Sequence, residues 1–123
     1  MPHVDRAYVG LALALLIVGE ALGLYMGIAG DMSLRSVHVT IVLPGFVTMA
    51  IYGLVFRLWP AMKTGSLVVV QFWLGALSTV GVIVGSYVLV VNGAIAVIAA
   101  SSVAALISAV LLGFLFWTHS QEA

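Results

Sequence analysis

The sequence predicts an all-α membrane protein folded as a transmembrane four-helix bundle. Hydrophobic residues make up 64% of the 123 residues and charged residues only 7%, whereas about 25% of the residues of a soluble domain are charged. The apolar residues form four runs of about 20 residues, the length of helix that crosses a hydrocarbon core about 30 Å thick. We expect the four helices to span about residues 7–28, 34–59, 66–91 and 93–118.

Short breaks with helix-ending and helix-starting residues separate the four runs. The first break contains Gly30 followed by Asp31, the second contains Pro60 and Ser66, and the third contains Gly93. Glycine is typical just after a helix, proline follows a helix end, and aspartate or serine is typical at the start of the next helix. Because the connections are short, we expect sequential helices to be antiparallel neighbours.

The composition excludes several classes of function. A chain of 123 residues with this content of apolar sequence forms one integral membrane domain, residues 1–123, and leaves no room for a soluble catalytic domain. The net charge is zero and no Lys/Arg cluster occurs, so neither a nucleic-acid partner nor a polybasic lipid-binding surface is expected. Because the chain has no cysteine, histidine is its only strong ligand for soft metals.

The distribution of charge predicts the orientation in the membrane. The first apolar run is longer than the core of a secretory signal and contains Glu20, so we interpret it as a spanning helix. An even number of spans places both termini on one side, together with Arg6, Arg57 and Lys63. The opposite side carries only Arg35. The positive-inside rule therefore predicts cytoplasmic termini, and we expect the inner membrane of a bacterium or archaeon.

Glu20 is the one acidic residue well inside a predicted span. A carboxyl group there is costly, and such groups usually face a bundle interior. One interpretation is a protonated side chain that forms a hydrogen bond across the bundle, and the other is part of a proton path. Gly19, Gly23 and Gly27 surround it at a spacing of four, a pattern that lets two helices pack closely and favours an oligomer.

His38 is the only histidine away from the chain ends, at the outer end of the second predicted helix. Helical periodicity places Gly45 and Met49 on its face. The missing side chain of Gly45 could leave a slot for a flat ligand with Met49 as an apolar wall, and Pro44 is expected to kink the helix there. Arg35, one turn before His38, could pair with a carboxylate at the surface. These residues outline a haem site, although an interfacial histidine beside a packing glycine would have the same pattern.

A family resemblance strengthens the haem interpretation. Residues 34–60 follow the order LR..H......GF..M..YG...R..P, and residues 71–85 read QFWLGALSTVGVIVG. Over about residues 19–88 the chain resembles small four-helix membrane proteins related to subunit I of haem-copper oxidases. The resemblance implies that His38 is an axial ligand of haem b. It also implies that the chain corresponds to one of three four-helix arcs in the twelve-helix subunit, which a homotrimer would restore.

Three positions depart from the pattern of that family. Where its small members commonly carry histidine, this chain has Thr40, Gln71 and Gly75. Gln71 is polar within a span but is a poor ligand for iron or copper, so we expect no copper. His3 and His119 lie near the termini, about 30 Å from His38. One internal histidine cannot build an oxidase-type centre with two metals, so we expect no enzyme in the isolated chain.

Three functions follow from these observations. The first is binding of haem b for electron transfer or haem sensing, with His38 as ligand. The second is a non-catalytic accessory subunit, without its own cofactor, of a larger respiratory or other membrane complex. The third is a small transporter or proton-path component that uses Glu20. For each, we expect the lipid bilayer as environment, and a homo-oligomer or a larger complex as assembly.

Overall fold

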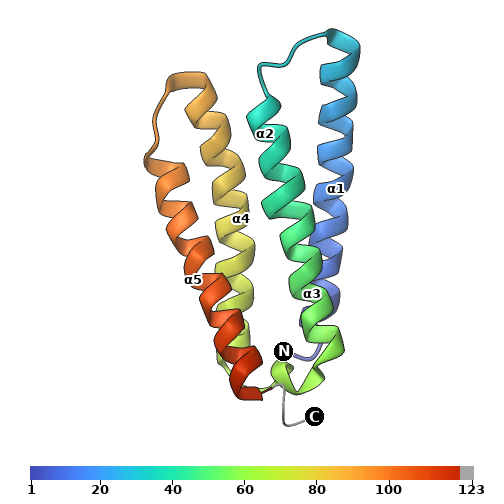
Figure 1. The fold of residues 1–123 in the computed structure, drawn as a ribbon, viewed down its shortest axis with the longest axis vertical. Coiled ribbons are helices and arrows are strands. Elements are labelled where there is room, and N and C mark those ends of the chain that lie inside the picture. The colour runs from blue at the N-terminus through green and yellow to red at the C-terminus, as the bar shows by residue number, and fades with distance from the viewer. Residues whose placement is uncertain (120–123) are drawn as a thin grey trace.

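The computed structural model describes residues 1–119, and within them the chain forms a bundle of four long helical spans arranged as two antiparallel hairpins (Figure 1). This confirms the predicted all-α four-helix fold. The first hairpin pairs α1 with a second span built of three successive segments, and the second hairpin pairs α4 with α5. The elements are α1 (Val4–Ala29), α2 (Arg35–Thr40), η1 (Ile41–Val47), α3 (Thr48–Leu58), η2 (Pro60–Lys63), α4 (Leu67–Asn92) and α5 (Ala96–His119).

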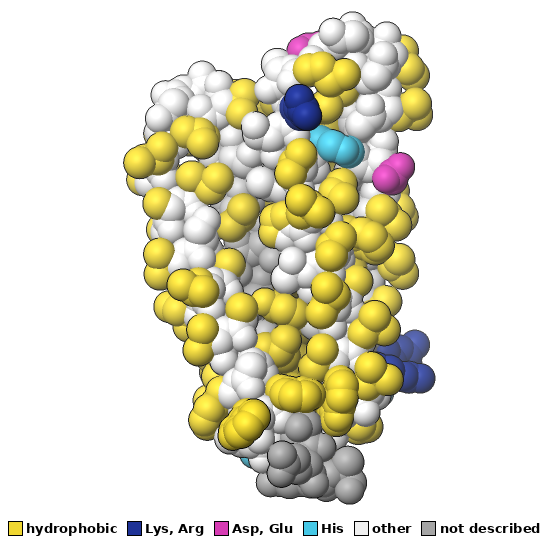
Figure 2. All heavy atoms as spheres, viewed as in Figure 1, with side chains coloured by type: hydrophobic (Ala, Val, Ile, Leu, Met, Phe, Trp, Pro, Cys, Tyr) yellow, Lys and Arg dark blue, Asp and Glu magenta, His cyan; other side chains and the backbone are white. Residues whose placement is uncertain are grey.

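All four spans are long and apolar enough to cross a membrane. Large apolar side chains cover much of the face shown in Figure 2. Exposed apolar side chains occur on every span and include those of Ile17, Leu54, Leu77 and Leu106. Lipid tails solvate such side chains, whereas water would not. The chain is therefore a multi-pass membrane protein, and the observed ends of the spans lie within three residues of the predicted ones.

Glycine ends two of the helices as predicted, but the predicted side-chain caps do not form. Gly30 and Gly93 take left-handed backbone conformations, with φ of 66° and 72°, which glycine adopts without steric cost. Neither α2 nor α4 has a side-chain hydrogen bond at its N-cap. Asp31 instead accepts a hydrogen bond from the backbone N–H of Ser33 at 2.9 Å, and this bond lowers the pKa of the Asp31 carboxyl.

The second span changes its helical geometry at Pro44. The seven residues of η1 form a π-helix around this proline, which removes one backbone donor from the ladder of hydrogen bonds. The Thr48 hydroxyl donates to the carbonyl of Leu43 at 3.1 Å and satisfies one of the acceptors in this segment. Because a π turn takes up more residues than an α turn, side chains after η1 face in other directions than a regular helix would give them.

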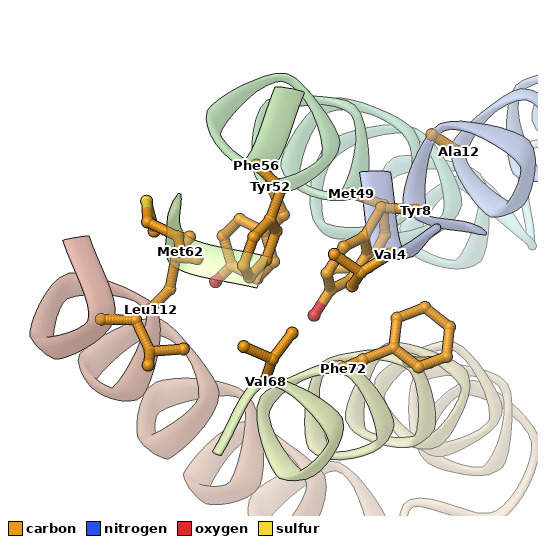
Figure 3. Packing of buried hydrophobic residues seen from close by; sticks show 12 residues of the cluster. Val4, Tyr8, Ala12, Met49, Tyr52, Phe56, Met62, Val68, Phe72 and Leu112 are labelled. Carbon is orange, nitrogen blue, oxygen red and sulfur yellow. The ribbon is translucent and has the colours of Figure 1, made fainter. Parts of the chain in front are cut away.

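The hydrophobic core lies toward the end of the bundle that holds the start of α1 and the end of α5. Tyr8 is fully buried at its centre, and its ring lies 5.5 Å from Tyr52, 6.0 Å from Phe56 and 4.9 Å from Phe72, measured between centroids (Figure 3). These contacts join α1 to α3 and to α4. Aromatic pairs at such distances add packing energy beyond the area they bury. The remaining members of the cluster are Val4, Ala12, Met49, Met62, Val68, Ala76, Leu112 and Leu115.

A buried carboxylate fixes the connections at the same end. The side chain of Asp5 is only 4% exposed and contacts Lys63 Nζ at 3.1 Å and Arg57 Nη1 at 3.2 Å. The N-terminal amino group of Met1 also donates to the carbonyl of Lys63 at 3.2 Å. These contacts join α1, α3 and η2. Separating them is costly, because removal of one partner from a buried ion pair leaves an uncompensated charge.

Small residues allow α4 and α5 to pack closely. A methyl group on Gly85 would lie 2.5 Å from the backbone nitrogen of Ile98 and 2.6 Å from its Cα. A methyl group on Gly81 would collide with the side chain of Ser101. Where lipid competes for apolar side chains, such close approach is a main source of helix association.

We predict that Gly85→Ala destabilises the bundle by about 1–3 kcal/mol, because the added methyl group overpacks the contact with α5. The measurement is the free energy of unfolding in mild detergent, followed by circular dichroism. Gly27→Ala is the matched control, since no atom lies within 4 Å of the added carbon. The control should be unchanged or up to about 1 kcal/mol more stable. Equal stability of the two variants would contradict the close packing of α4 on α5.

Candidate functional site

His38 lies on α2 with its ring against α1. Its Nδ1 is 2.9 Å from the backbone carbonyl oxygen of Gly19. A carbonyl oxygen only accepts hydrogen bonds, so Nδ1 carries the proton in this contact. In a neutral imidazole the other ring nitrogen, Nε2, then holds a free lone pair. The half-buried ring is thus fixed in one tautomer, with one nitrogen left to accept a proton or bind a metal.

Two glycines of α1 let the second span approach closely, Gly23 at the His38 ring and Gly19 at Val42. A methyl group on Gly23 would lie 2.9 Å from His38 Cε1, and one on Gly19 would lie 3.0 Å from Val42 Cγ2. Gly27, the third glycine of the stripe, has no atom within 4 Å of that position. The predicted close helix packing is therefore confirmed at Gly19 and Gly23, where it occurs between two helices of the same chain.

Arg35 and His38 both lie near the end of the molecule opposite the start of α1. Arg35 is exposed, one turn before His38, and its side chain forms no hydrogen bond or ion pair within residues 1–119. On the face shown in Figure 2, histidine atoms lie directly beside Lys/Arg atoms near the top of the first hairpin. The guanidinium group is therefore available to an anionic group bound near the imidazole.

Gly45 and Met49 do not join this site, so the predicted slot beside Gly45 is wrong. A methyl group on Gly45 would lie 3.0 Å from Leu15 Cδ1, which shows that Leu15 fills the space. Met49 is 2% exposed and its sulfur accepts a hydrogen bond of 3.7 Å from Thr79 of α4. The prediction assumed a regular helix, whereas the π-helical segment η1 changes the register of the residues that follow His38.

Glu20 lies on the outer surface of α1 and not in the bundle interior. Its side chain is exposed, and within the described residues it has neither a hydrogen-bond partner nor an ion pair. The expectation of a hydrogen bond across the bundle is therefore wrong for the single chain. The neighbouring Gly19 is buried under the second span, so Glu20 flanks the contact between His38 and α1.

Gln71 forms a buried polar network that joins three helices. The side chain is 0% exposed, its Oε1 accepts a hydrogen bond of 2.5 Å from the Tyr8 hydroxyl, and its Nε2 donates to Ser108 Oγ at 3.2 Å. A methyl group on Gly75, one turn further along α4, would lie 2.7 Å from the Tyr8 hydroxyl oxygen and 2.9 Å from Ser108 Oγ. The network therefore fills the space at two positions, 71 and 75, where the resembled family has histidines.

The network and the imidazole are separate places in the molecule. Tyr8 and Gly19 are 11 residues apart on α1, which corresponds to about 16 Å along a helix. Thr40, the third departure from the family pattern, donates to the carbonyl of Val37 in its own helix at 2.9 Å. Within residues 1–119, no three His, Asp or Glu side chains lie close enough together to hold a metal ion. The His38 ring, held by its contact with the Gly19 carbonyl, is thus separate from the buried network around Gln71.

Sequence reasoning missed the roles of Tyr8 and Asp5. Both lie within one and a half turns of the start of α1, and their partners lie 52 to 63 positions away in the chain. A tyrosine and an aspartate near the end of a span are common at a membrane surface. Their position on the buried face of the helix was the available signal, because both repeat with Val4 and Ala12 at helical spacing.

No protein-family model, curated protein or solved structure matches this chain. The fold class rests on the structure itself, which defines a four-span membrane protein with a single oriented internal imidazole. The resemblance to relatives of haem-copper oxidase subunit I stays a prediction from the residue order described above.

We predict that Gln71→Leu lowers the free energy of unfolding by about 1–3 kcal/mol, because Tyr8 and Ser108 lose their partner in a buried position. A double-mutant cycle with Tyr8→Phe should give a coupling energy of about 0.6 kcal/mol, the average for hydrogen bonds between membrane helices, and at most about 1.7 kcal/mol. Ser102→Ala, at an exposed position of α5, is the control and should leave stability unchanged. Additive effects of Gln71→Leu and Tyr8→Phe would contradict the hydrogen bond between them.

Proposed function

We propose that this chain is a small haem-binding membrane protein in which Nε2 of His38 is an axial ligand of haem b, and that it serves electron transfer or haem sensing. The observation that carries the proposal is the hydrogen bond between His38 Nδ1 and the Gly19 carbonyl. A metal-binding histidine almost always donates its other ring N–H to a carbonyl or carboxylate, which fixes the ring and raises the basicity of the ligating nitrogen.

The residues around His38 fit one face of such a site. The imidazole supplies the ligand atom, Gly23 admits the ring next to α1, and Arg35 is free to pair with a haem propionate near the headgroups. Leu15 closes the space at Gly45, so the porphyrin would lie against the outer surface of the first hairpin. Bound haem supplies a one-electron iron couple, and the chain supplies the ligand, its orientation and an apolar environment.

An external haem site needs a second protein surface, because one chain covers only one face of the porphyrin. A homo-oligomer would provide this cover, with His38 of two copies on opposite sides of the iron or with a neighbouring copy as an apolar wall. We propose a homotrimer, from the resemblance to three arcs of four helices, or association with a larger membrane complex. The three-to-one count of Lys/Arg residues supports cytoplasmic termini in a bacterial or archaeal inner membrane.

The absorption spectrum tests this proposal. Protein purified from haem-replete membranes should show a Soret band and reduced-minus-oxidised α and β bands. Both should vanish in His38→Ala, while His3→Ala, at the opposite end of the molecule, should keep them. Gly23→Ala should lower haem affinity about tenfold by displacing the ring, and Gly27→Ala should leave affinity unchanged. A colourless wild-type protein, or unchanged bands in His38→Ala, would refute haem binding at His38.

A second candidate is an accessory subunit without its own cofactor, packed against a larger membrane complex. The Tyr8–Gln71–Ser108 network favours it, because hydrogen bonds and packing occupy two positions where the resembled family places histidines. For this candidate, the chain should co-purify with a larger complex in mild detergent, and His38→Ala should co-purify equally well. A haem-bearing homo-oligomer that purifies without other subunits would contradict it.

A further inference from the structure

A cationic groove opens between α1 and α3 at the end of the bundle that holds the start of α1 and the end of α5. It has a volume of about 380 Å³ and is lined by Asp5, Arg6, Val9, Leu54 and Arg57. Lys/Arg atoms protrude from this flank of the molecule in Figure 2. A methyl group on Gly53 would lie 2.7 Å from Val9 Cγ2, so close contact of the two helices fixes the floor of the groove.

The groove carries a net positive charge. Asp5 is 4% exposed and already contacts both Lys63 and Arg57, so its carboxylate is neutralised within the protein. Arg57 contacts Asp5 through Nη1, and 70% of the Arg57 side chain is exposed. The exposed side chain of Arg6 forms no hydrogen bond or ion pair within residues 1–119. Arg6, Arg57 and Lys63 against the one carboxylate of Asp5 leave a net charge of +2, and the Arg6 guanidinium and the exposed part of the Arg57 guanidinium remain available to an anion.

The groove changes from charged to apolar along the direction of the membrane normal. The 26 residues of α1 extend about 39 Å, about 9 Å more than the hydrocarbon core. Arg6 lies two residues from the start of α1, and Arg57 lies one residue from the end of α3. In a bilayer whose hydrocarbon core is centred on α1, both would lie at the level of the lipid phosphates. Val9 and Leu54 are three residues deeper, about 4.5 Å, at the level of the acyl chains.

We propose that the Arg6–Arg57 groove binds an anionic phospholipid, with the phosphate between the two guanidinium groups and an acyl chain along Val9 and Leu54. The planar guanidinium group donates two parallel hydrogen bonds to phosphate oxygens. A zwitterionic lipid binds less tightly, because its own ammonium group already balances the charge of its phosphate. The cations give the preference for anionic headgroups, and the apolar floor selects a lipid over a free anion. The site is independent of His38 and needs no haem.

Native mass spectrometry of the full chain in mild detergent tests this site with phosphatidylglycerol and phosphatidylcholine as probes. Wild-type protein should retain phosphatidylglycerol in preference to phosphatidylcholine. Arg6→Gln and Arg57→Gln should each lower the affinity for phosphatidylglycerol about fivefold. This is the equivalent of about 1 kcal/mol per cation near the membrane surface. Phosphatidylcholine should be unaffected. Arg6→Lys keeps the charge but loses the planar pair of hydrogen-bond donors, so it should lower the affinity for phosphatidylglycerol by less than Arg6→Gln does.

Arg35→Gln is the charge-matched control, because it removes one positive charge at the other end of the bundle, and it should keep the wild-type preference. Arg6→Gln breaks no side-chain hydrogen bond or ion pair within residues 1–119, so its melting temperature should equal that of the wild type. Arg57→Lys retains the charge that pairs with Asp5. Equal retention of both lipids by the wild type would overturn the proposal. A preserved preference for phosphatidylglycerol in the Arg6→Gln/Arg57→Gln variant would also overturn it. So would displacement of the lipid by millimolar inorganic phosphate.

Discussion

The hydrogen bond from Tyr8 to Gln71 is the interaction on which the arrangement of the two hairpins depends. Lipid solvates apolar side chains as well as a neighbouring helix does, so specific polar contacts and close packing must hold membrane helices together. The Tyr8 ring packs on Tyr52, Phe56 and Phe72 while its hydroxyl reaches Gln71. The ion pairs of Asp5 reinforce the same end, and the hairpins diverge toward the opposite end (Figure 1).

This asymmetry separates the parts of the molecule that hold the fold from the part that carries the imidazole. His38 lies toward the divergent end and depends on the first hairpin alone, through the Gly19 carbonyl and the space above Gly23. Gln71 and Gly75 lie in a packed polar network with Tyr8 and Ser108, and this network stabilises the bundle away from His38. A ligand at His38 therefore need not enter the bundle, and its site faces neighbouring lipid or protein.

Hydropathy and glycine spacing were sufficient to predict the four spans and the close packing at Gly19 and Gly23, because both depend on local sequence. The environment of His38 was predicted only in part. Regular helical periodicity placed Gly45 and Met49 beside it, but the π-helical segment at Pro44 turns them toward Leu15 and toward α4. The ion pairs of Asp5 and the exposure of Glu20 depend on how each helix is rotated about its axis. That rotation follows from contacts between residues distant in the sequence, which periodicity alone does not reveal.

The protonation of the His38 ring tests the central claim that this imidazole is held by α1 with Nε2 free to bind a ligand. Nitrogen NMR of the haem-free full chain, labelled at histidine, distinguishes the two neutral tautomers, and the His38 signal is identified by its loss in His38→Ala. The account predicts a proton on Nδ1, hydrogen-bonded to the Gly19 carbonyl, and an unprotonated Nε2. A neutral His38 with its proton on Nε2 would contradict the account, because the contact with Gly19 and the free ligand atom would both be absent.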